Sequence, residues 1–420
     1  MSEPDVSDLL SVRQAIEVID SAPVTPPVVR LPLAEALGLR LAEDLSADRD
    51  FPPFDKSLMD GYAVMSADVS SGPATLRLTG EVAAGGQAAR PLSAGEAVAI
   101  MTGAPMPPGA QGVVPIEETA REGDVVRIHR ALDPTRFVAR RGADVAAGTL
   151  VLPRGTRLEA PQIAVAAAVG AHHVSVHPRV QVAVLSTGDE LVPIDQTPTG
   201  AQIRNSNGPM LVALLQRMGG DVADLGIVID QKEQIRAAIE EGLRHDVLFV
   251  SGGMSMGAYD YVPQLLREMN LDLRITKLRI KPGKPFVFAV REGSGFRVQG
   301  SEKDQSAISS RFVFGLPGNP VSGFVCTVRL ASHLIERLSG GTPTERRITA
   351  RLASPLPANG PREFYQPTKL SHTPDGPVAT PLGWKGSADL FTLATADGLL
   401  VRGENEPARA IGDMVRVLGF

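Results

Sequence analysis

Two patterns of hydrophobic and polar positions alternate through the central part of the chain: short apolar runs, and longer segments with the spacing of an amphipathic helix. Val180–Leu185 and Asp246–Val250 are short apolar runs, as expected for strands buried on both faces of a sheet. Asn207–Met218 instead carries leucine or methionine at i, i+3, i+4 and i+7, with Asn207 as a candidate N-cap. A second strand–helix pair follows at Val222–Val228 and Lys232–Arg244. This alternation predicts a doubly wound α/β sheet with a mainly parallel core.

Two other segments contain short β-type runs separated by glycine and proline turns. They cover about 51–140 and about 342–420, and each predicts a small all-β unit. Proline or glycine bounds the remaining expected elements, which are helices at Ser11–Ser21, Ala34–Leu37 and Leu158–Gly170 and a short strand at Val28–Leu31.

Composition narrows the class of protein. The chain has 420 residues, 43% of them hydrophobic, and a formal net charge of −5, which excludes wholesale disorder and argues against a general nucleic-acid binder. Its single cysteine, Cys326, excludes an intrachain disulfide and a multi-cysteine metal site. The acidic N-terminus does not resemble a signal peptide, and no apolar run reaches the length of a membrane span. We therefore expect a cytoplasmic protein.

The chain is also rich in glycine and proline, with 42 and 34 residues and no collagen period. Several of them fall in polar loops that follow three predicted strands. Ligands bind beyond the carboxyl ends of the strands in such sheets, and exposed backbone N–H groups there suit phosphate. Any one loop is also compatible with an ordinary turn, but three at one edge favour a ligand site. The loops contain Ser186, Thr187, Gly188, Asp189 and Glu190; Ser251, Gly252, Gly253, Met254 and Ser255; and Pro317, Gly318, Asn319 and Pro320.

Charged residues in or near these loops suggest metal and oxyanion binding. Carboxylates are the ligands that Mg²⁺ prefers, although Asp230, just before a helix, is equally well explained as an N-cap. Lysines on a stiff proline-glycine turn can neutralise phosphate, whereas on an ordinary surface they would be solvated. The candidate acids are Asp189, Glu190, Asp230 and Asp260, and the lysines are Lys277, Lys281 and Lys284.

The first β-rich segment has two shaped loops of its own. Phe51–Val64 (FPPFDKSLMDGYAV) and Met101–Ala110 (MTGAPMPPGA) combine prolines and glycines with aspartates and a threonine. Loops from two separate units suggest a site assembled at an interface. The histidines are scattered without metal-ligand spacing, and no nucleophile–base pair is evident. The chemistry is therefore that of a phosphorylated or oxyanion substrate bound with Mg²⁺.

These motifs, taken together, resemble the bacterial molybdopterin molybdenumtransferases and the E domain of gephyrin. The resemblance spans 52–322, with the N-terminal helix and the C-terminal β-rich segment also fitting. The matching motifs, in the family's order, are PPFDKSLMDGYAV, IMTGAPMPPGA, RRGADVAAG, STGDEL, SGGMSMGAYD, IKPGKP and GLPGNPVS.

The resemblance implies the last step of molybdenum cofactor synthesis. Molybdate would be inserted into adenylyl-molybdopterin, with Mg²⁺-dependent release of AMP. It further implies a homodimer whose cleft lies between subunits, with the adenylyltransferase and molybdoenzyme acceptors as partners and no nucleic acid or membrane. The implied units are a discontinuous elongated domain of 1–50 plus 141–177, a β domain of 51–140, an α/β molybdopterin-binding domain of 178–340 and a C-terminal barrel-like domain of 341–420.

The resemblance also assigns roles to individual residues. Asp60, Thr102, Glu190, Lys277 and Lys281 match the family's catalytic positions, and Arg362 aligns by the shape of its segment. Asp230, Asp260 and Glu190 would hold Mg²⁺. The three loops would bind the substrate through Ser186, Thr187, Gly188, Asp189, Ser251, Gly252, Gly253, Ser255, Asp260, Pro317, Gly318, Asn319 and Pro320.

Some residues depart from the family's pattern. Lys56 replaces a frequent Asn, Met254 and Met256 replace Val-type residues, and Gly293–Arg311 resembles a polar insertion. None of these changes removes a motif acid or lysine. Two rival functions share parts of the resemblance: a molybdopterin adenylyltransferase, which lacks the two β units, and a non-catalytic gephyrin-like scaffold, which carries a fused domain and linker.

Overall fold

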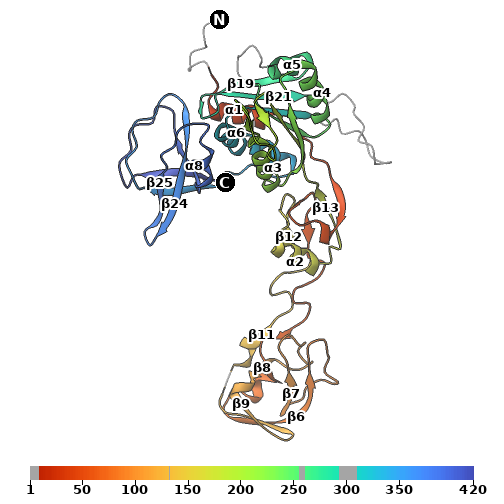
Figure 1. Ribbon diagram of the computed structural model, residues 1–420. Coiled ribbons are helices and arrows are strands. Elements are labelled where there is room, and N and C mark those ends of the chain that lie inside the picture. Colours follow the sequence, from red (N-terminus) through yellow and green to blue (C-terminus); the bar gives the residue numbers. More distant parts are fainter. Residues whose placement is uncertain (1–8, 132, 255–260, 293–309) are drawn as a thin grey trace, which may run out of the picture.

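The computed structural model describes residues 9–131, 133–254, 261–292 and 310–420. Figure 1 shows an elongated molecule, with a distal β unit at the far end of a narrow arm. At the other end, an α/β unit lies beside a C-terminal barrel. In the described part of the chain, no helix is long and apolar enough to cross a membrane.

The α/β unit is built on a six-stranded sheet in the order β17-β14-β18-β22-β21-β19. The first four strands are parallel, and β21 runs antiparallel to both of its neighbours, β22 and β19. This confirms the predicted doubly wound sheet with a mainly parallel core. The strands are β14 (Gln181–Thr187), β17 (Asp221–Val228), β18 (Val247–Ser251), β19 (Asp272–Lys277), β21 (Pro285–Arg291) and β22 (Arg311–Leu316), with a small pair β15 (Leu191–Val192) and β16 (Ile203–Arg204) beside them.

Both faces of this sheet are covered because its strands are apolar on both sides. Val182 and Val184 of β14 join a core with α1 and α3, while Ala183 and Leu185 join a second core with α4 and α5. The helices are α1 (Val12–Asp20), α3 (Asn207–Arg217), α4 (Lys232–Gly242), α5 (Val262–Glu268), α6 (Pro320–Cys326) and α7 (Ser332–Leu338), with a π-helical turn (Thr327–Ala331) joining the last two.

Helix α3 begins differently from the expectation. Ser206, not Asn207, occupies the N-cap position, and the backbone N–H of Gly208 donates to Oδ1 of Asn205 at 3.0 Å. Asn207 is therefore the first helical residue, and its side chain is available for contacts elsewhere. The expected helix at Ala34–Leu37 is only a 3₁₀ turn, Leu33–Glu35.

The arm is made of two stretches of chain that run in opposite directions. Strands from before residue 50 pair with strands from after residue 140, in a sheet β1-β13-β2 and a pair β12-β3. The elements are β1 (Val29–Pro32), β2 (Arg40–Leu41), β3 (Leu45–Ser46), β12 (Leu150–Leu152), α2 (Ala160–Ala168) and β13 (His173–His177). The distal β unit is therefore inserted into the arm.

The distal β unit is a six-stranded sheet in the order β8-β5-β7-β6-β10-β9, as the short β-runs predicted. A two-residue pair, β4 with β11, joins it to the arm. The strands are β4 (Lys56–Ser57), β5 (Gly61–Val64), β6 (Ala74–Val82), β7 (Glu96–Ile100), β8 (Gly112–Pro115), β9 (Thr119–Glu122), β10 (Val125–Ile128) and β11 (Val138–Ala139), with 3₁₀ turns at Ser66–Asp68, Ile116–Glu118 and Pro134–Phe137.

The C-terminal barrel closes because β26 pairs with both β27 and β24. One of its strands, β20, comes from the α/β unit in sequence and pairs with β24, so the two units share a sheet. The elements are β20 (Ile280–Lys281), β23 (Arg347–Leu352), β24 (Glu363–Thr373), β25 (Gly376–Pro381), α8 (Leu390–Ala394), β26 (Gly398–Arg402) and β27 (Met414–Gly419).

Candidate functional site

Three sequence-predicted loops meet at one edge of the α/β sheet, here called the carboxyl edge. Ser186, Ser251 and Leu316 occupy one register line across β14, β18 and β22, so the loops that follow these strands start side by side. The N–H of Gly252 donates to the carbonyl of Leu316 at 3.2 Å, which holds the second loop against the third. The predicted convergence of the loops is thus present in the fold.

Asn207 ties these loops together from the start of helix α3. Its Nδ2 lies 2.8 Å from the hydroxyl of Ser251 and 2.7 Å from the carbonyl oxygen of Gly318. Our sequence interpretation treated Asn207 as a helix cap and missed this role. An asparagine at the start of a predicted helix, close in sequence to the loop that follows the first strand, was the available signal.

Glycine is required where the second loop lies against the first. Gly252 has φ +99°, and a Cβ there would lie 2.3 Å from the carbonyl oxygen of Thr187. Among the described residues, the buried Oγ1 of Thr187 and Oδ1 of Asn207 have no hydrogen-bond partner. A buried polar atom without a partner is costly, so both atoms are suited to meet a polar ligand at this edge.

Two acidic residues meet beside the first loop. Oδ1 of Asp189 accepts a hydrogen bond from the backbone N–H of Asp230 at 2.9 Å. Gln231, not Asp230, occupies the N-cap position of α4, so Asp230 is not a helix cap. The exposed Glu190 folds back over Gly188, where a Cβ would lie 2.6 Å from its Oε2. No group of three His, Cys, Asp or Glu side chains suited to a metal occurs in the residues described.

The predicted basic residues lie where the α/β unit meets the barrel. Lys281 pairs in register with Phe364, and its ammonium lies 4.6 Å from the centre of that ring. Arg362 immediately precedes β24, so it lies along the same strand pair as Lys281 although far from it in sequence. Lys277 ends β19, opposite Pro285. The fold thus brings Lys281 and Arg362 to neighbouring positions.

The third loop also contacts the barrel. Nδ2 of Asn319 lies 3.0 Å from the hydroxyl of Ser387, and the N–H of Val321 donates to the Ser387 carbonyl at 3.1 Å. Pro317, Gly318 and Pro320 complete this loop, and Pro320 starts helix α6. The barrel therefore borders the carboxyl edge on the side of the third loop.

Asp60 and Thr102 form a pair of their own in the distal β unit. Oδ1 of Asp60 accepts from the backbone N–H of Thr102 at 2.7 Å and from its hydroxyl at 2.8 Å. These two hydrogen bonds lower the pKa of Asp60 from its usual value, so the exposed carboxylate is ionised at neutral pH. Figure 1 shows that the whole arm separates this unit from the carboxyl edge, so one chain does not bring the two groups together.

Some predicted residues lie outside the described part of the chain. They are Ser255, Met256, Asp260 and, up to residue 309, the suspected insertion at 293–311. Gly253, with φ +65°, and Met254 are the last residues described in the second loop. Lys56 lies in the short pair that joins the distal β unit to the arm, opposite Ala139.

Family models match almost the whole chain. Residues 10–170 match the "MoeA N-terminal region (domain I and II)", 183–337 a "Probable molybdopterin binding domain" and 349–420 the "MoeA C-terminal region (domain IV)". The "Molybdopterin molybdenumtransferase" of Synechocystis sp. is 32% identical over 96% of this chain and 98% of its own length. The Staphylococcus aureus protein of the same name is 29% identical over 93% and 91%.

Solved structures agree with these matches. Two structures of the molybdopterin biosynthesis MoeA protein from Pyrococcus horikoshii superpose with TM-scores of 0.78 and 0.80, at 30% and 26% identity. Each superposition covers 98% of this chain and 99% or 100% of the other. The multidomain fold is therefore that of MoeA structures.

Proposed function

The chain belongs to the MoeA family of molybdopterin molybdenumtransferases, enzymes of molybdenum cofactor biosynthesis, and from this we propose its reaction in detail. Molybdate is inserted into adenylyl-molybdopterin, and the adenylyl group leaves as AMP with the help of Mg²⁺. The observation that carries the proposal is the convergence of three loops, with two unpaired buried polar atoms, at the carboxyl edge. These loops suit a phosphorylated substrate because they offer N–H groups and hydroxyls.

Lys281 and Arg362 supply the positive charge of the proposed site. Their neighbouring placement at the junction of the α/β unit and the barrel suits a phosphoanhydride or molybdate oxyanion. Charge of this kind, held in place before the reaction, stabilises negative charge that develops on a leaving phosphate. Lys277 lies in the same segment of the chain and adds to this positive charge.

The acid pair Asp189 and Asp230 fits a Mg²⁺ ion that the substrate helps to bind. Mg²⁺ usually takes one or two carboxylates together with waters and substrate phosphates. The backbone of Asp230 lies within hydrogen-bond distance of the Asp189 carboxylate, and the described residues hold no group of three His, Cys, Asp or Glu suited to a metal. Glu190 and Asp260 remain our further candidates. When bound, the ion would neutralise charge on the phosphoanhydride.

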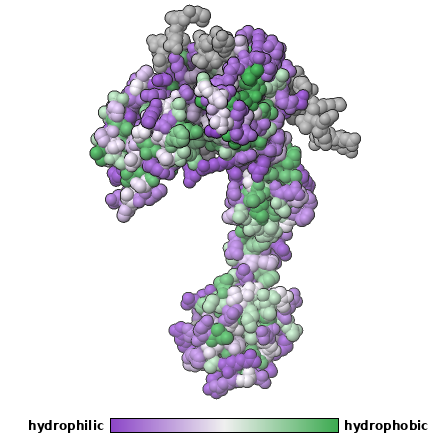
Figure 2. All heavy atoms as spheres, in the orientation of Figure 1, coloured by the Kyte–Doolittle hydropathy of each residue, from purple (hydrophilic) through white to green (hydrophobic). Residues whose placement is uncertain are grey.

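We propose that a second copy of the chain completes the site with its own Asp60 and Thr102. Exposed apolar side chains support a partner at both places, since such patches usually mark interfaces. Phe54, Leu58 and Met101 are exposed near Asp60, and Figure 2 shows further apolar surface along the arm. On the α/β unit, the exposed apolar residues near the acid pair are Ile194, Ile203 and Ile229.

We propose that the chain is divided into four units, each with its own role in this shared site. A distal β unit of 51–140 reaches the partner, and an arm of 1–50 with 141–177 carries it. The unit of 178–340 binds the substrate, and the barrel of 341–420 closes one side. This division explains why the predicted catalytic residues fall into two groups that one chain keeps apart.

The experiment that tests the reaction supplies purified protein with adenylyl-molybdopterin, molybdate and Mg²⁺ and measures AMP release. The shared site is tested by mixing two inactive variants, Asp60→Ala and Lys281→Met. Random exchange between dimers leaves one intact site in each mixed dimer, so about a quarter of the wild-type activity should return. No AMP from the wild type would refute the reaction, and no recovery in the mixture would refute the shared site.

A further inference from the structure

Strand β24 presents different chemistry on its two faces. Side chains alternate along a strand, so Glu363 and Tyr365 share one face while Arg362 and Phe364 share the other. The first face is buried against the α/β unit, and the second faces Lys281.

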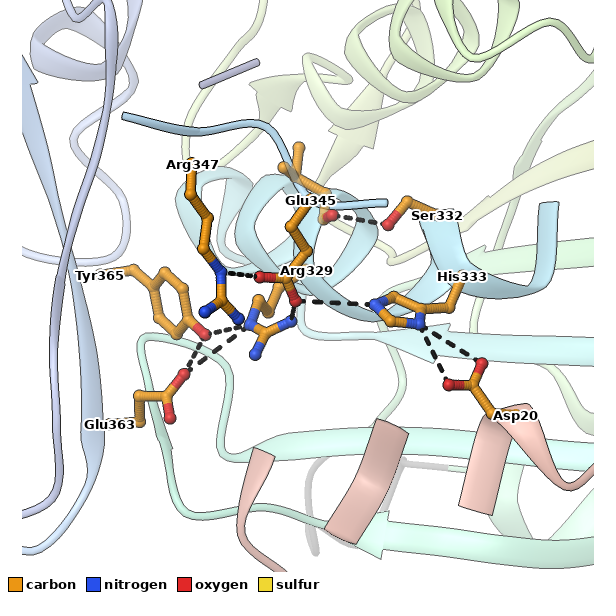
Figure 3. Close-up of polar contacts among 9 residues, drawn as sticks. Asp20, Arg329, Ser332, His333, Glu345, Arg347, Glu363 and Tyr365 are labelled. Atoms are coloured by element: carbon orange, nitrogen blue, oxygen red, sulfur yellow. Dashed lines mark hydrogen bonds and ion pairs between the residues drawn. The ribbon is translucent and has the colours of Figure 1, made fainter. Parts of the chain in front are cut away.

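The buried face is held by Arg329, as Figure 3 shows. This arginine lies in the π-helical turn between α6 and α7, and its side chain is only 10% exposed. Its Nε donates to the hydroxyl of Tyr365 at 2.6 Å and lies 3.7 Å from Oε1 of Glu363. Tyr365 also donates to Glu363, so both residues of this face are fixed to the same guanidinium.

The same arginine is anchored to other parts of the chain. It donates to Glu345, which lies between α7 and β23 and also accepts from Arg347. His333 of α7 lies 3.7 Å from Glu345 and 3.3 Å from the carboxylate of Asp20 in α1 (Figure 3). We call Arg329 and the side chains that it holds, Glu363, Tyr365 and Glu345, the Arg329 clamp. Through Glu345 and His333, this clamp joins strand β24 to two helices of the α/β unit.

The opposite face carries an aromatic stack that meets Lys281. Phe364 and Trp384 stack with ring centres 5.8 Å apart and planes inclined by 26°. The Lys281 ammonium lies 4.6 Å from the centre of the Phe364 ring. Phe364 is thus in contact with both Trp384 and the lysine, and its position follows that of the clamped strand.

We propose that Phe364 is a positioning residue that holds the Lys281 ammonium over its ring at the junction of the α/β unit and the barrel, and that Arg329 holds Phe364 through Tyr365 and Glu363. This inference rests on the proposed function, because it takes Lys281 to bind the substrate's anionic group.

The physical reason lies in the freedom of a lysine side chain. An exposed lysine samples many rotamers, and fixing them on binding costs free energy. An aromatic ring attracts the ammonium and narrows that distribution of rotamers before the substrate arrives, while the N–H groups that do not face the ring remain able to reach an oxyanion. Arg362, on the same strand, is placed by the same clamp.

The direct test compares Phe364→Leu with Phe364→Tyr, which keeps an aromatic face. We expect the leucine variant to raise KM for adenylyl-molybdopterin about two- to fivefold with little change in kcat, and the tyrosine variant to restore it. In a Lys281→Met background, which is inactive, the same Phe364→Leu change should have no further effect on the Kd for adenylyl-molybdopterin, measured by calorimetry. Equal KM values for leucine and wild type, or additive effects of the two changes, would overturn the proposal.

The remote part of the proposal is tested with the chain's single tryptophan, Trp384, as a probe. Tyr365→Phe removes the hydroxyl that Arg329 and Glu363 share. We expect it to shift the Trp384 emission to the red, to increase quenching by acrylamide and to raise KM in the same direction as Phe364→Leu. Unchanged emission and unchanged KM would refute the link from Arg329 to the stack.

A matched control comes from the distal β unit, where the guanidinium of Arg136 lies 4.8 Å from the ring centre of Phe137. Phe137→Leu removes a cation–π pair of the same kind and should leave Trp384 emission unchanged. Failure of the proposed function would be recognised separately: Lys281→Met would then leave the Kd for adenylyl-molybdopterin unchanged, whereas the emission change in the Tyr365→Phe variant would persist.

Discussion

Glu345→Gln should destabilise the junction between the barrel and the α/β unit in a pH-dependent way. The carboxylate of Glu345 is 19% exposed and faces Arg329, Arg347 and His333 (Figure 3). Its burial alone raises the pKa, but the His333 ring, the Arg347 hydrogen bond and the Arg329 charge outweigh burial and lower the pKa from 4.5 to about 2. Glutamine keeps the size of the side chain and removes the charge.

The magnitude follows from linkage between protonation and folding. At 1.36 kcal/mol per pKa unit, a fall from 4.5 to about 2 corresponds to ~3 kcal/mol of stability at neutral pH. Residual contact with water screens part of this, so we expect a loss of about 2 kcal/mol in the variant. Because the pKa is lower in the folded state, this stability is complete above the unfolded value of 4.5 and disappears as pH falls toward 2.

The assay is urea unfolding followed by Trp384, which lies in the barrel, at about pH 7 and about pH 3. The difference in free energy of unfolding between wild type and Glu345→Gln should shrink to less than half in acid. Glu268→Gln is the control, because Glu268 makes a more exposed pair with Lys232 and should cost less than about 1 kcal/mol. A difference that is absent near pH 7, or that grows in acid, would refute the reasoning.

Four further outcomes are expected. Asp60→Ala should abolish AMP release while circular dichroism and the melting temperature stay unchanged, and full turnover would remove Asp60 from the site. Thr102→Val removes one of the donors that lower the pKa of Asp60, so the acid limb of the kcat/KM profile should move to higher pH; an unmoved limb would contradict this. Gly252→Ala places a Cβ 2.3 Å from a carbonyl oxygen at a positive φ and should weaken substrate binding at least about tenfold, measured by calorimetry. Burial raises the pKa of the Cys326 thiol well above its usual value, so a thiol reagent should modify it only after unfolding; rapid labelling of the native protein would show the thiol to be accessible.

The sequence predicted those parts of the fold that rest on local pattern. Apolar runs gave the strands of the parallel sheet, since each is buried on both faces, and Leu211 and Leu215 correctly marked the buried face of α3. The loops after β14, β18 and β22 could be placed at one edge because parallel strands end together. Helix starts were less predictable, because Asn205, Ser206 and Asn207 are all suited to cap a helix. In the fold Ser206 takes the N-cap position, Asn205 accepts from Gly208, and Asn207 contacts the third loop.

Local sequence patterns did not predict the contacts between segments that are far apart in the chain. Nothing in the sequence near Lys281 indicates that it pairs with a strand beginning at Glu363, and the family resemblance alone suggested Arg362. The Arg329 clamp was missed for the same reason, because Arg329 and Tyr365 are 36 residues apart in the sequence. A lone arginine in an apolar helix, among buried residues such as Leu330, was the available signal.

The two-stranded arm has a mechanical consequence. The chain travels out to the distal β unit and returns beside itself, with β4 and β11 hydrogen-bonded where the unit begins. A unit joined by one strand could rotate about the bonds of that strand, whereas two paired connections restrict this rotation. Both connections of the distal β unit therefore limit how far the Asp60 carboxylate can turn relative to the arm.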